Sequence, residues 1–236
     1  MALRRAQQKL IAGIAVLTLA AGGAYYRYGY PFNQTPSAPV VPGNNDFEHP
    51  AAYPASTANL TLQQRELFSD PMNGIGLRYN VNNYPGLSLD LNMYPVGALS
   101  WVNNPNLLDD EADVILADMD YLIQHGRWQQ RLETLREPVV LQEQPALRLH
   151  FKLQTGTTAI YKIIFLLVQE DKYVKFSMES ADLSPNALQQ AQGLVEHLLP
   201  QVHAPPESDY ARKIRDEHQA KMKQKVQELL RQRQEG

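Results

Sequence analysis

Apolar and polar residues alternate along several short stretches in the middle of the chain. In residues 75–81 every second residue is apolar, and residues 87–93 repeat this pattern after a turn rich in Asn, Pro and Gly. A period of two residues places the apolar side chains on one face of a β-strand. Two such strands around a turn of this composition predict a β-hairpin with one buried face.

More strands are expected in the second half of the same region. Val139 and Leu141 indicate a short strand, and residues 147–153 alternate over a longer one. Residues 160–168 lose the alternation and become apolar on both faces, which is typical of a strand inside a sheet that is covered on both sides. Residues 173–178 alternate again, so they predict an antiparallel partner for that central strand.

A helical period first appears in residues 107–126. Three carboxylates near its start suit the unpaired N–H groups and the positive dipole end of a helix. Its apolar residues recur every three or four positions and form one stripe that predicts packing on the sheet, namely Ala112, Ile115, Met119, Leu122 and Ile123. Asp118 and Asp120 are expected to face solvent, and Gly126 marks the end of the helix.

A second helix is predicted from Pro185 onwards. Ser184 is expected as its N-cap, Pro185 fits the first helical position, and Pro200 ends it. Its buried stripe consists of Leu188, Ala191, Val195, Leu198 and Leu199. The combined pattern predicts an α+β domain over residues 59–202, in which an antiparallel sheet of five to six strands packs against two amphipathic helices.

The segments on either side of this domain have different compositions. Residues 31–58 are rich in Pro, Asn and Ala and show no period, which predicts a flexible tether. Residues 203–236 are rich in Lys, Arg, Glu and Gln, which predicts a charged helix. This helix is either solvated on all sides or docked on a partner, for which it offers the sparse apolar residues Ile214, Met222, Val226 and Leu229.

The first 30 residues have the pattern of an export signal or a membrane anchor. Three basic residues precede an uncharged run from Leu10 to Ala24, and two tyrosines follow it. This pattern predicts either a cleaved signal peptide or a single-pass anchor formed by residues 10–26. The basic residues place the amino terminus in the cytoplasm. The domain is therefore expected on the periplasmic side of a bacterial inner membrane, or free in the periplasm or secreted after cleavage.

Composition excludes several classes of function. The chain of 236 residues has no cysteine, which excludes disulfides and thiolate metal sites, and its net charge of −3 argues against a nucleic-acid-binding surface. The six histidines and the acidic residues 109–120 lack the spacing of a metal site. No Gly-x-Ser-x-Gly turn or phosphate-binding glycine loop occurs in a suitable context. We therefore expect no catalytic residue, cofactor or metal.

The order of the predicted elements adds a resemblance. An early hairpin, a helix, a long hairpin that contains Tyr173-Val174-Lys175-Phe176, and a closing helix that ends in Leu198-Leu199-Pro200 together resemble PsbP-like domains. The resemblance covers residues 68–202. It implies an α/β sandwich and a non-catalytic accessory or assembly role at a membrane complex, and it assigns no functional residue in this chain.

The expected function is that of a membrane-tethered or secreted envelope accessory protein, which binds a partner protein and is not an enzyme. The residues expected to bind this partner are Trp101, Trp128, Ile214, Met222, Val226 and Leu229. Both tryptophans also fit a role in capping the core. The alternative is a small-ligand-binding or hydrolytic periplasmic domain with a pocket near Trp101, into which Arg78, Asp90 or His150 would converge.

Overall fold

The computed structural model describes residues 46–47, 53–68, 70–84, 86–97, 105–126, 128–155, 158–180, 183–207, 209, 212–217, 220, 221 and 224. The predicted signal or anchor, residues 1–30, lies outside this part of the chain, as do Trp101, Met222, Val226 and Leu229. Within the described residues, no helix combines the length and the apolar character needed to cross a lipid bilayer.

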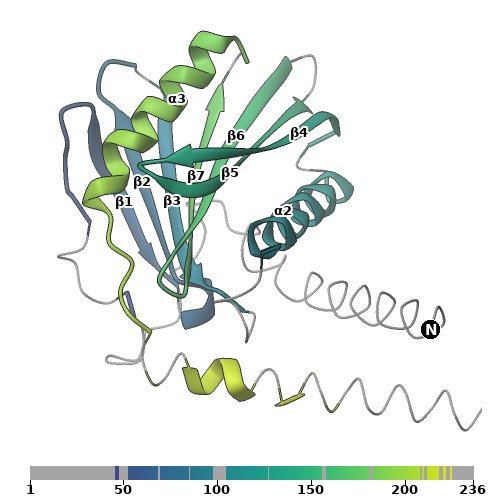
Figure 1. The fold of residues 1–236 in the computed structure, drawn as a ribbon. Helices are drawn as coiled ribbons and strands as arrows, with labels where there is room; N and C mark the ends of the chain where they lie inside the picture. The colour runs from purple at the N-terminus through teal and green to yellow at the C-terminus, as the bar shows by residue number, and fades with distance from the viewer. Residues whose placement is uncertain are drawn as a thin grey trace, which may run out of the picture.

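The described strands form one antiparallel sheet in the order β1-β2-β3-β7-β6-β5-β4 (Figure 1). The strands are β1 Leu60–Leu67, β2 Ile75–Val81, β3 Ser88–Pro95, β4 Gln130–Leu141, β5 Gln144–Thr155, β6 Thr158–Gln169 and β7 Lys172–Ser180. The predicted α+β architecture is confirmed. The sheet has seven strands in the described part of the chain, however, and not the five or six that the sequence predicts.

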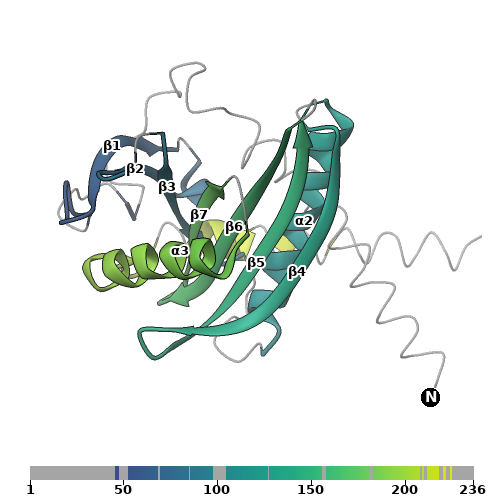
Figure 2. The same ribbon diagram turned by 90° about the horizontal axis from the view of Figure 1, so that it is seen from above.

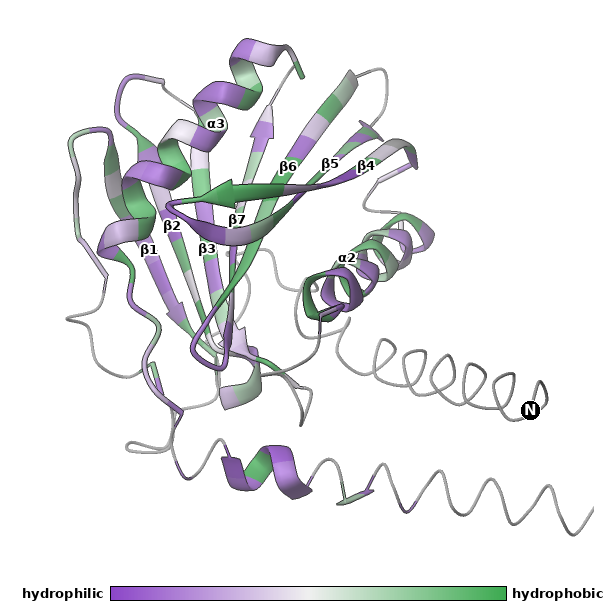
Figure 3. Cartoon of the chain, in the orientation of Figure 1, coloured by the Kyte–Doolittle hydropathy of each residue, from purple (hydrophilic) through white to green (hydrophobic). Residues whose placement is uncertain are grey.

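Two helices cover opposite faces of this sheet (Figure 2). Helix α2, Leu107–Gln124, packs against β4, β5 and β6, and helix α3, Pro185–Leu198, packs against β6 and β7. The backbone N–H of Ala187 donates to Ser184 Oγ at 3.2 Å, which confirms the predicted N-cap of α3. Hydrophobic and hydrophilic residues interchange along both helices, as the sequence pattern predicts (Figure 3).

Strand β6 is the interior strand that its sequence predicts. It lies between β7 and β5. Phe165 and Leu167 belong to the core beneath α3, whereas Ile164 and Leu166 belong to the core beneath α2. Because successive side chains of a strand point to opposite faces, an apolar run in β6 supplies both cores at once.

The sequence prediction misses β1 and most of β4 because neither strand keeps a regular two-residue period. The pairing register shifts between Leu62 and Gln64 in β1 and between Arg131 and Glu133 in β4. An extra residue in a strand moves the side chains that follow to the other face, so the alternation is lost. Strand β4 also contains Pro138, which a strand tolerates at the edge of a sheet. Only its last three residues are recognisable in the sequence.

Part of the predicted tether contributes to the core. Phe47 is 1 % exposed and Tyr53 is buried, and both join the cluster beneath α3. Arg65 Nη2 donates to the backbone carbonyl of Phe47 at 3.0 Å, which fixes this segment beside β1. The prediction of a flexible tether over residues 31–58 is therefore wrong at the buried residues Asp46, Phe47 and Tyr53. Its average composition is polar, but two aromatic side chains are enough to bury these positions.

Tyr79 makes the stability of this core sensitive to alkaline pH. Its side chain is fully buried, its hydroxyl donates to the carbonyl of Pro54 at 3.2 Å, and burial raises its pKa to about 12. An unfolded tyrosine ionises near pH 10, so the folded protein holds this proton more tightly. The stability that Tyr79 adds is therefore complete below pH 10 and is lost as the pH rises from 10 to 12.

The substitution Tyr79→Phe tests this pH dependence. We expect the urea midpoint of the parent protein to fall between pH 10 and pH 12, and to fall less steeply in Tyr79→Phe because this group no longer titrates. Parallel curves for the two proteins would show that Tyr79 does not cause the loss.

Candidate functional site

The structure places two of the predicted partner-binding residues. Trp128 is half-buried and packs on the core beneath α2, as expected for a residue that caps the core. Ile214 is half-buried in the helical segment near the C-terminus, whose described residues are 209, 212–217, 220, 221 and 224 and which we call the tail helix. Trp101, Met222, Val226 and Leu229 lie outside the described residues, so their role in partner binding stays a prediction.

The acidic residues of α2 have partners on the edge strand β4. Arg136 contacts Asp109 at 3.1 Å, and Arg131 contacts Asp120 at 2.8 Å. Asp118 is 1 % exposed, so the prediction that it faces solvent is wrong. The sequence prediction for these acids considers only the helix and its dipole. It does not include the arginines of β4, because Arg136 lies 27 positions after Asp109 and Arg131 lies 11 positions after Asp120. The acidic residues on α2 therefore help to attach the helix to β4.

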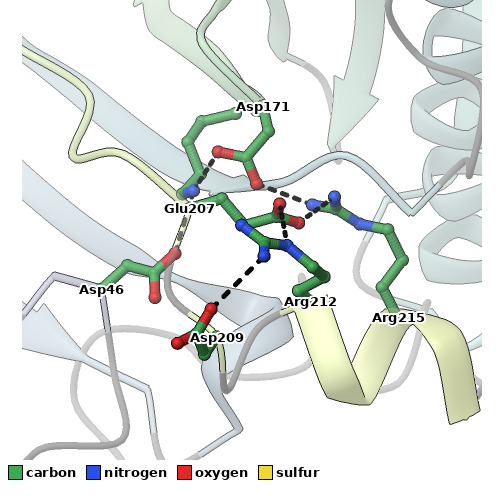
Figure 4. A network of polar contacts seen from close by, with 7 residues as sticks. Asp46, Asp171, Glu207, Asp209, Arg212 and Arg215 are labelled. Carbon is green, nitrogen blue, oxygen red and sulfur yellow. Dashed lines mark hydrogen bonds and ion pairs between the residues drawn. The ribbon is translucent and has the colours of Figure 1, made fainter.

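A cluster of buried charges lies at the turn between β6 and β7 (Figure 4). Lys172 pairs with Asp171, and its Nζ lies 2.9 Å from Asp46 Oδ2 in a charge contact without hydrogen-bond alignment. Arg215 Nη2 donates to Asp171 Oδ2 at 2.7 Å, and Arg215 also pairs with Glu207. Four of the five side chains are at least nine-tenths buried. We call these five residues the charge cluster.

The charge cluster joins three separate parts of the chain. Asp46 comes from the segment before β1, Asp171 from the β6–β7 turn and Lys172 from the first position of β7. Glu207 and Arg215 come from the C-terminal region. Its outer edge is formed by Arg212, which contacts Glu207 and Asp209 at 3.1 and 3.3 Å (Figure 4). Every cation of the cluster pairs with a carboxylate of this chain, so the arrangement fits a junction between segments.

A small polar hollow lies on the face of the sheet that carries α2. Arg78 forms a two-point contact with Asp90, with Nε–Oδ1 and Nη2–Oδ2 distances of 2.7 and 2.9 Å. The hollow has a volume of about 180 Å³, and its other lining residues are Ser88, Lys162, Ser177, Met178 and Glu179. Ligand pockets usually measure about 300–1,000 Å³. This hollow is therefore too small for a typical ligand.

This hollow is not the pocket near Trp101 that the sequence suggests as an alternative. Arg78 and Asp90 do come together, but His150 pairs with Ile163, whose side chain belongs to the opposite core. None of the lining residues comes from the region between Leu107 and Trp128. The converging group of Arg78, Asp90 and His150 is therefore not formed, and Trp101 lies outside the described residues.

A more open groove of about 470 Å³ runs between α3 and β5. Its lining includes Leu188, Gln189, Gln192 and Glu196 from α3 and Arg148 from β5. Arg148 already pairs with Glu137 of β4 at 2.7 Å. The groove is thus shallow, mixed in polarity and without a concentration of one charge.

The edge strand β4 carries three of the four large apolar side chains that are exposed in the described part of the chain. Leu132, Leu135 and Val140 are 45 %, 48 % and 64 % exposed, and the remaining large exposed apolar side chain is Tyr84. The opposite edge strand, β1, exposes the polar residues Thr61, Gln63 and Arg65 instead. The two edges of the sheet therefore differ in the polarity of their exposed side chains. The exposed residues Leu132 and Leu135 are not among the predicted partner-binding residues, because this part of β4 is not predicted as a strand.

No group of three or more side chains suited to hold a metal ion occurs among the described residues. No family model and no curated protein matches the chain. Several solved structures are similar to the chain. The cyanobacterial PsbP protein CyanoP from Synechocystis sp. PCC 6803 has 13 % identity and a TM-score of 0.39, and the match covers 63 % of this chain and 94 % of that one.

Another similar structure is a Pseudomonas aeruginosa protein of unknown function described as a putative regulator. It has 9 % identity and a TM-score of 0.29, and the match covers 64 % of this chain and 100 % of that one. The match to CyanoP agrees with the resemblance to PsbP-like domains that the sequence predicts. Both likenesses concern the fold and carry nothing about function.

Proposed function

We propose that this protein is a non-catalytic envelope accessory protein, held at a membrane by residues 10–26, which binds a partner protein along the edge strand β4. The membrane segment rests on the sequence pattern of basic residues followed by an apolar run. The binding surface rests on one observation, namely that β4 is an edge strand of the sheet formed by the described residues and has three exposed aliphatic side chains. An edge of this kind is a ready template for a strand of another protein.

Three charged residues of β4 support this proposal because they are neutralised within the chain. Arg131 and Arg136 pair with acids of α2, and Glu137 pairs with Arg148 of β5. Edge strands are commonly protected by charges that repel an incoming strand. Arg131, Arg136 and Glu137 are engaged within the chain, so they are not free to protect the edge of β4 in this way. A partner strand paired with this edge would meet Leu135 on the face of the sheet that carries α3 and Val140 on the opposite face, because the two positions lie five residues apart.

Pro138 limits where such a segment can pair. Proline has no N–H, and in a sheet it occurs where its nitrogen faces away from the neighbouring strand. Backbone groups of alternate residues point in the same direction. Thr134 and Arg136 are therefore expected to turn their backbone N–H groups outwards, and the ladder is interrupted at Pro138. We place the partner contact around Leu135, before this interruption.

Site-specific photo-crosslinking of the full chain in cells tests the proposal. A photoreactive residue in place of Leu135 is expected to give one discrete adduct, found in the membrane fraction. The same residue in place of Gln63, which is exposed on the opposite edge strand β1, serves as the matched control and should give none.

The substitution Leu132→Lys adds a charge to the β4 edge and is expected to reduce the Leu135 adduct at least about tenfold, equivalent to about 1.4 kcal/mol. The proposal fails if Leu135 and Gln63 give the same adduct, if Leu132→Lys leaves the adduct unchanged, or if the adduct is cytosolic.

A further inference from the structure

The segments that enter and leave the sheet domain meet at one turn (Figure 4). The entering segment places Asp46 2.9 Å from Lys172, and the next residue, Phe47, has its ring centroid 5.9 Å from the same ammonium group. The tail helix places Arg215 2.7 Å from Asp171. Because Asp171 and Lys172 are adjacent and paired, both segments depend on the same two residues of the sheet.

Carboxylates outnumber cations in the charge cluster, so the loss of one cation affects both segments. The cluster holds three carboxylates, Asp46, Asp171 and Glu207, against two cations, Lys172 and Arg215. Without Arg215, Glu207 would keep its contact with Arg212, but the buried carboxylates of Asp46 and Asp171 would share one ammonium group. An incompletely paired charge is strongly unfavourable in a buried place. Asp171 is fixed by the β6–β7 turn, whereas Asp46 lies outside the sheet. The repulsion is therefore relieved most readily when Asp46 leaves.

We infer that docking of the tail helix and docking of the segment at Asp46 and Phe47 are thermodynamically coupled through Arg215. The coupling is reciprocal, because a contact that favours one docked segment in the presence of the other acts equally in both directions. Arg215 is the link because its side chain is 6 % exposed and reaches Asp171. Arg212 of the same helix is 57 % exposed. Its ion pairs are with Glu207 and Asp209 and not with Asp171.

This coupling connects the two ends of the protein. A partner that binds and withdraws the tail helix would loosen the segment that leads back to residues 10–26, and so change how the domain is held at its predicted anchor. That consequence rests on the proposed function. The coupling itself is a property of the folded chain and is tested without a partner.

Thiol labelling measures release of the entering segment. The chain contains no cysteine, so Phe47→Cys introduces a single thiol at a buried position, and its reaction with a small thiol reagent requires this segment to open. In the full chain with Phe47→Cys, we expect Arg215→Gln to accelerate labelling by about 5- to 150-fold, the usual range of such couplings. Arg212→Gln is the matched control, and we expect a change of less than about twofold because Arg212 does not reach Asp171.

Two further variants make the result specific to charge. Arg215→Lys keeps the cation and should label more slowly than Arg215→Gln, which separates loss of charge from general misfolding. Asp46→Asn removes the repelled carboxylate, so the acceleration caused by Arg215→Gln should shrink when it is added. The inference is overturned if Arg215→Gln accelerates labelling no more than Arg212→Gln does, or if its effect is the same with Asp46 and with Asn at that position.

Discussion

Replacing Lys172 by methionine is expected to destabilise the folded protein by about 3–5 kcal/mol, the range seen when one partner of a buried ion pair is removed. The Lys172 side chain is fully buried and holds both Asp46 and Asp171. Lys172→Met keeps most of the side-chain volume, so the loss comes from the carboxylates left behind and not from a cavity. Urea unfolding of the two proteins at neutral pH measures the difference in the free energy of unfolding.

Lys162→Met is the matched control for this prediction. Lys162 lies on the neighbouring strand β6 and contacts Glu179 at 3.6 Å, but the Glu179 side chain is 53 % exposed. Pairs with an exposed partner contribute about 0–1 kcal/mol. We therefore expect a loss of at most about 1 kcal/mol for Lys162→Met. Similar losses for the two variants would show that burial of Lys172 among carboxylates has no special importance.

The main role of the charge cluster is to fix the positions of two chain segments, and its contribution to stability is secondary. Apolar residues of similar size can often replace a buried ion pair without loss of stability. A charged group, by contrast, accepts few positions, because each alternative leaves it unpaired. Asp46 and Arg215 therefore fix the entering segment and the tail helix at one turn, whereas Phe47 alone would fit many apolar surfaces.

The elements with strong local signals are the ones that the sequence predicts well. Helix α3 has a serine cap, a proline at its first position and a regular apolar stripe, and β6 is apolar on both faces. Strands β1 and β4 have no such signal, since a register shift interrupts each of them. Their positions are decided by pairing with the neighbouring strands β2 and β5, and the pattern within a single strand does not contain this information.

The charge cluster could not be predicted from local sequence patterns. Its residues come from positions 46, 171–172 and 207–215, and each resembles an ordinary solvated charge in its local sequence. Glu170-Asp171-Lys172 predicts a turn, which is correct, but burial of its side chains depends on two segments far away in the chain. The one local hint is an aromatic residue, Phe47, beside Asp46 in an otherwise polar stretch.

Replacing Gly74 by alanine is expected to cost at least about 3 kcal/mol, because the change requires the backbone of a neighbouring strand to move. Gly74 joins the short 3-10 helix η2, Pro71–Asn73, to β2, and its φ is 68°. A Cβ atom there would lie 1.8 Å from the carbonyl oxygen of Met93 in β3. Met93 pairs with Ile75 at the start of β2, so relief of the clash would break the register of two strands that carry the core.

Gly86→Ala is the control for an alanine at a positive φ without a steric clash. Gly86 also has a positive φ, of 86°, but a Cβ atom there would meet nothing within 4 Å. An alanine in the left-handed region costs about 1–2 kcal/mol. We expect urea unfolding to show a loss in this range for Gly86→Ala and a clearly larger loss for Gly74→Ala. Equal losses would mean that the approach of β3 to Gly74 does not constrain the hairpin, since the positive φ alone would then explain both.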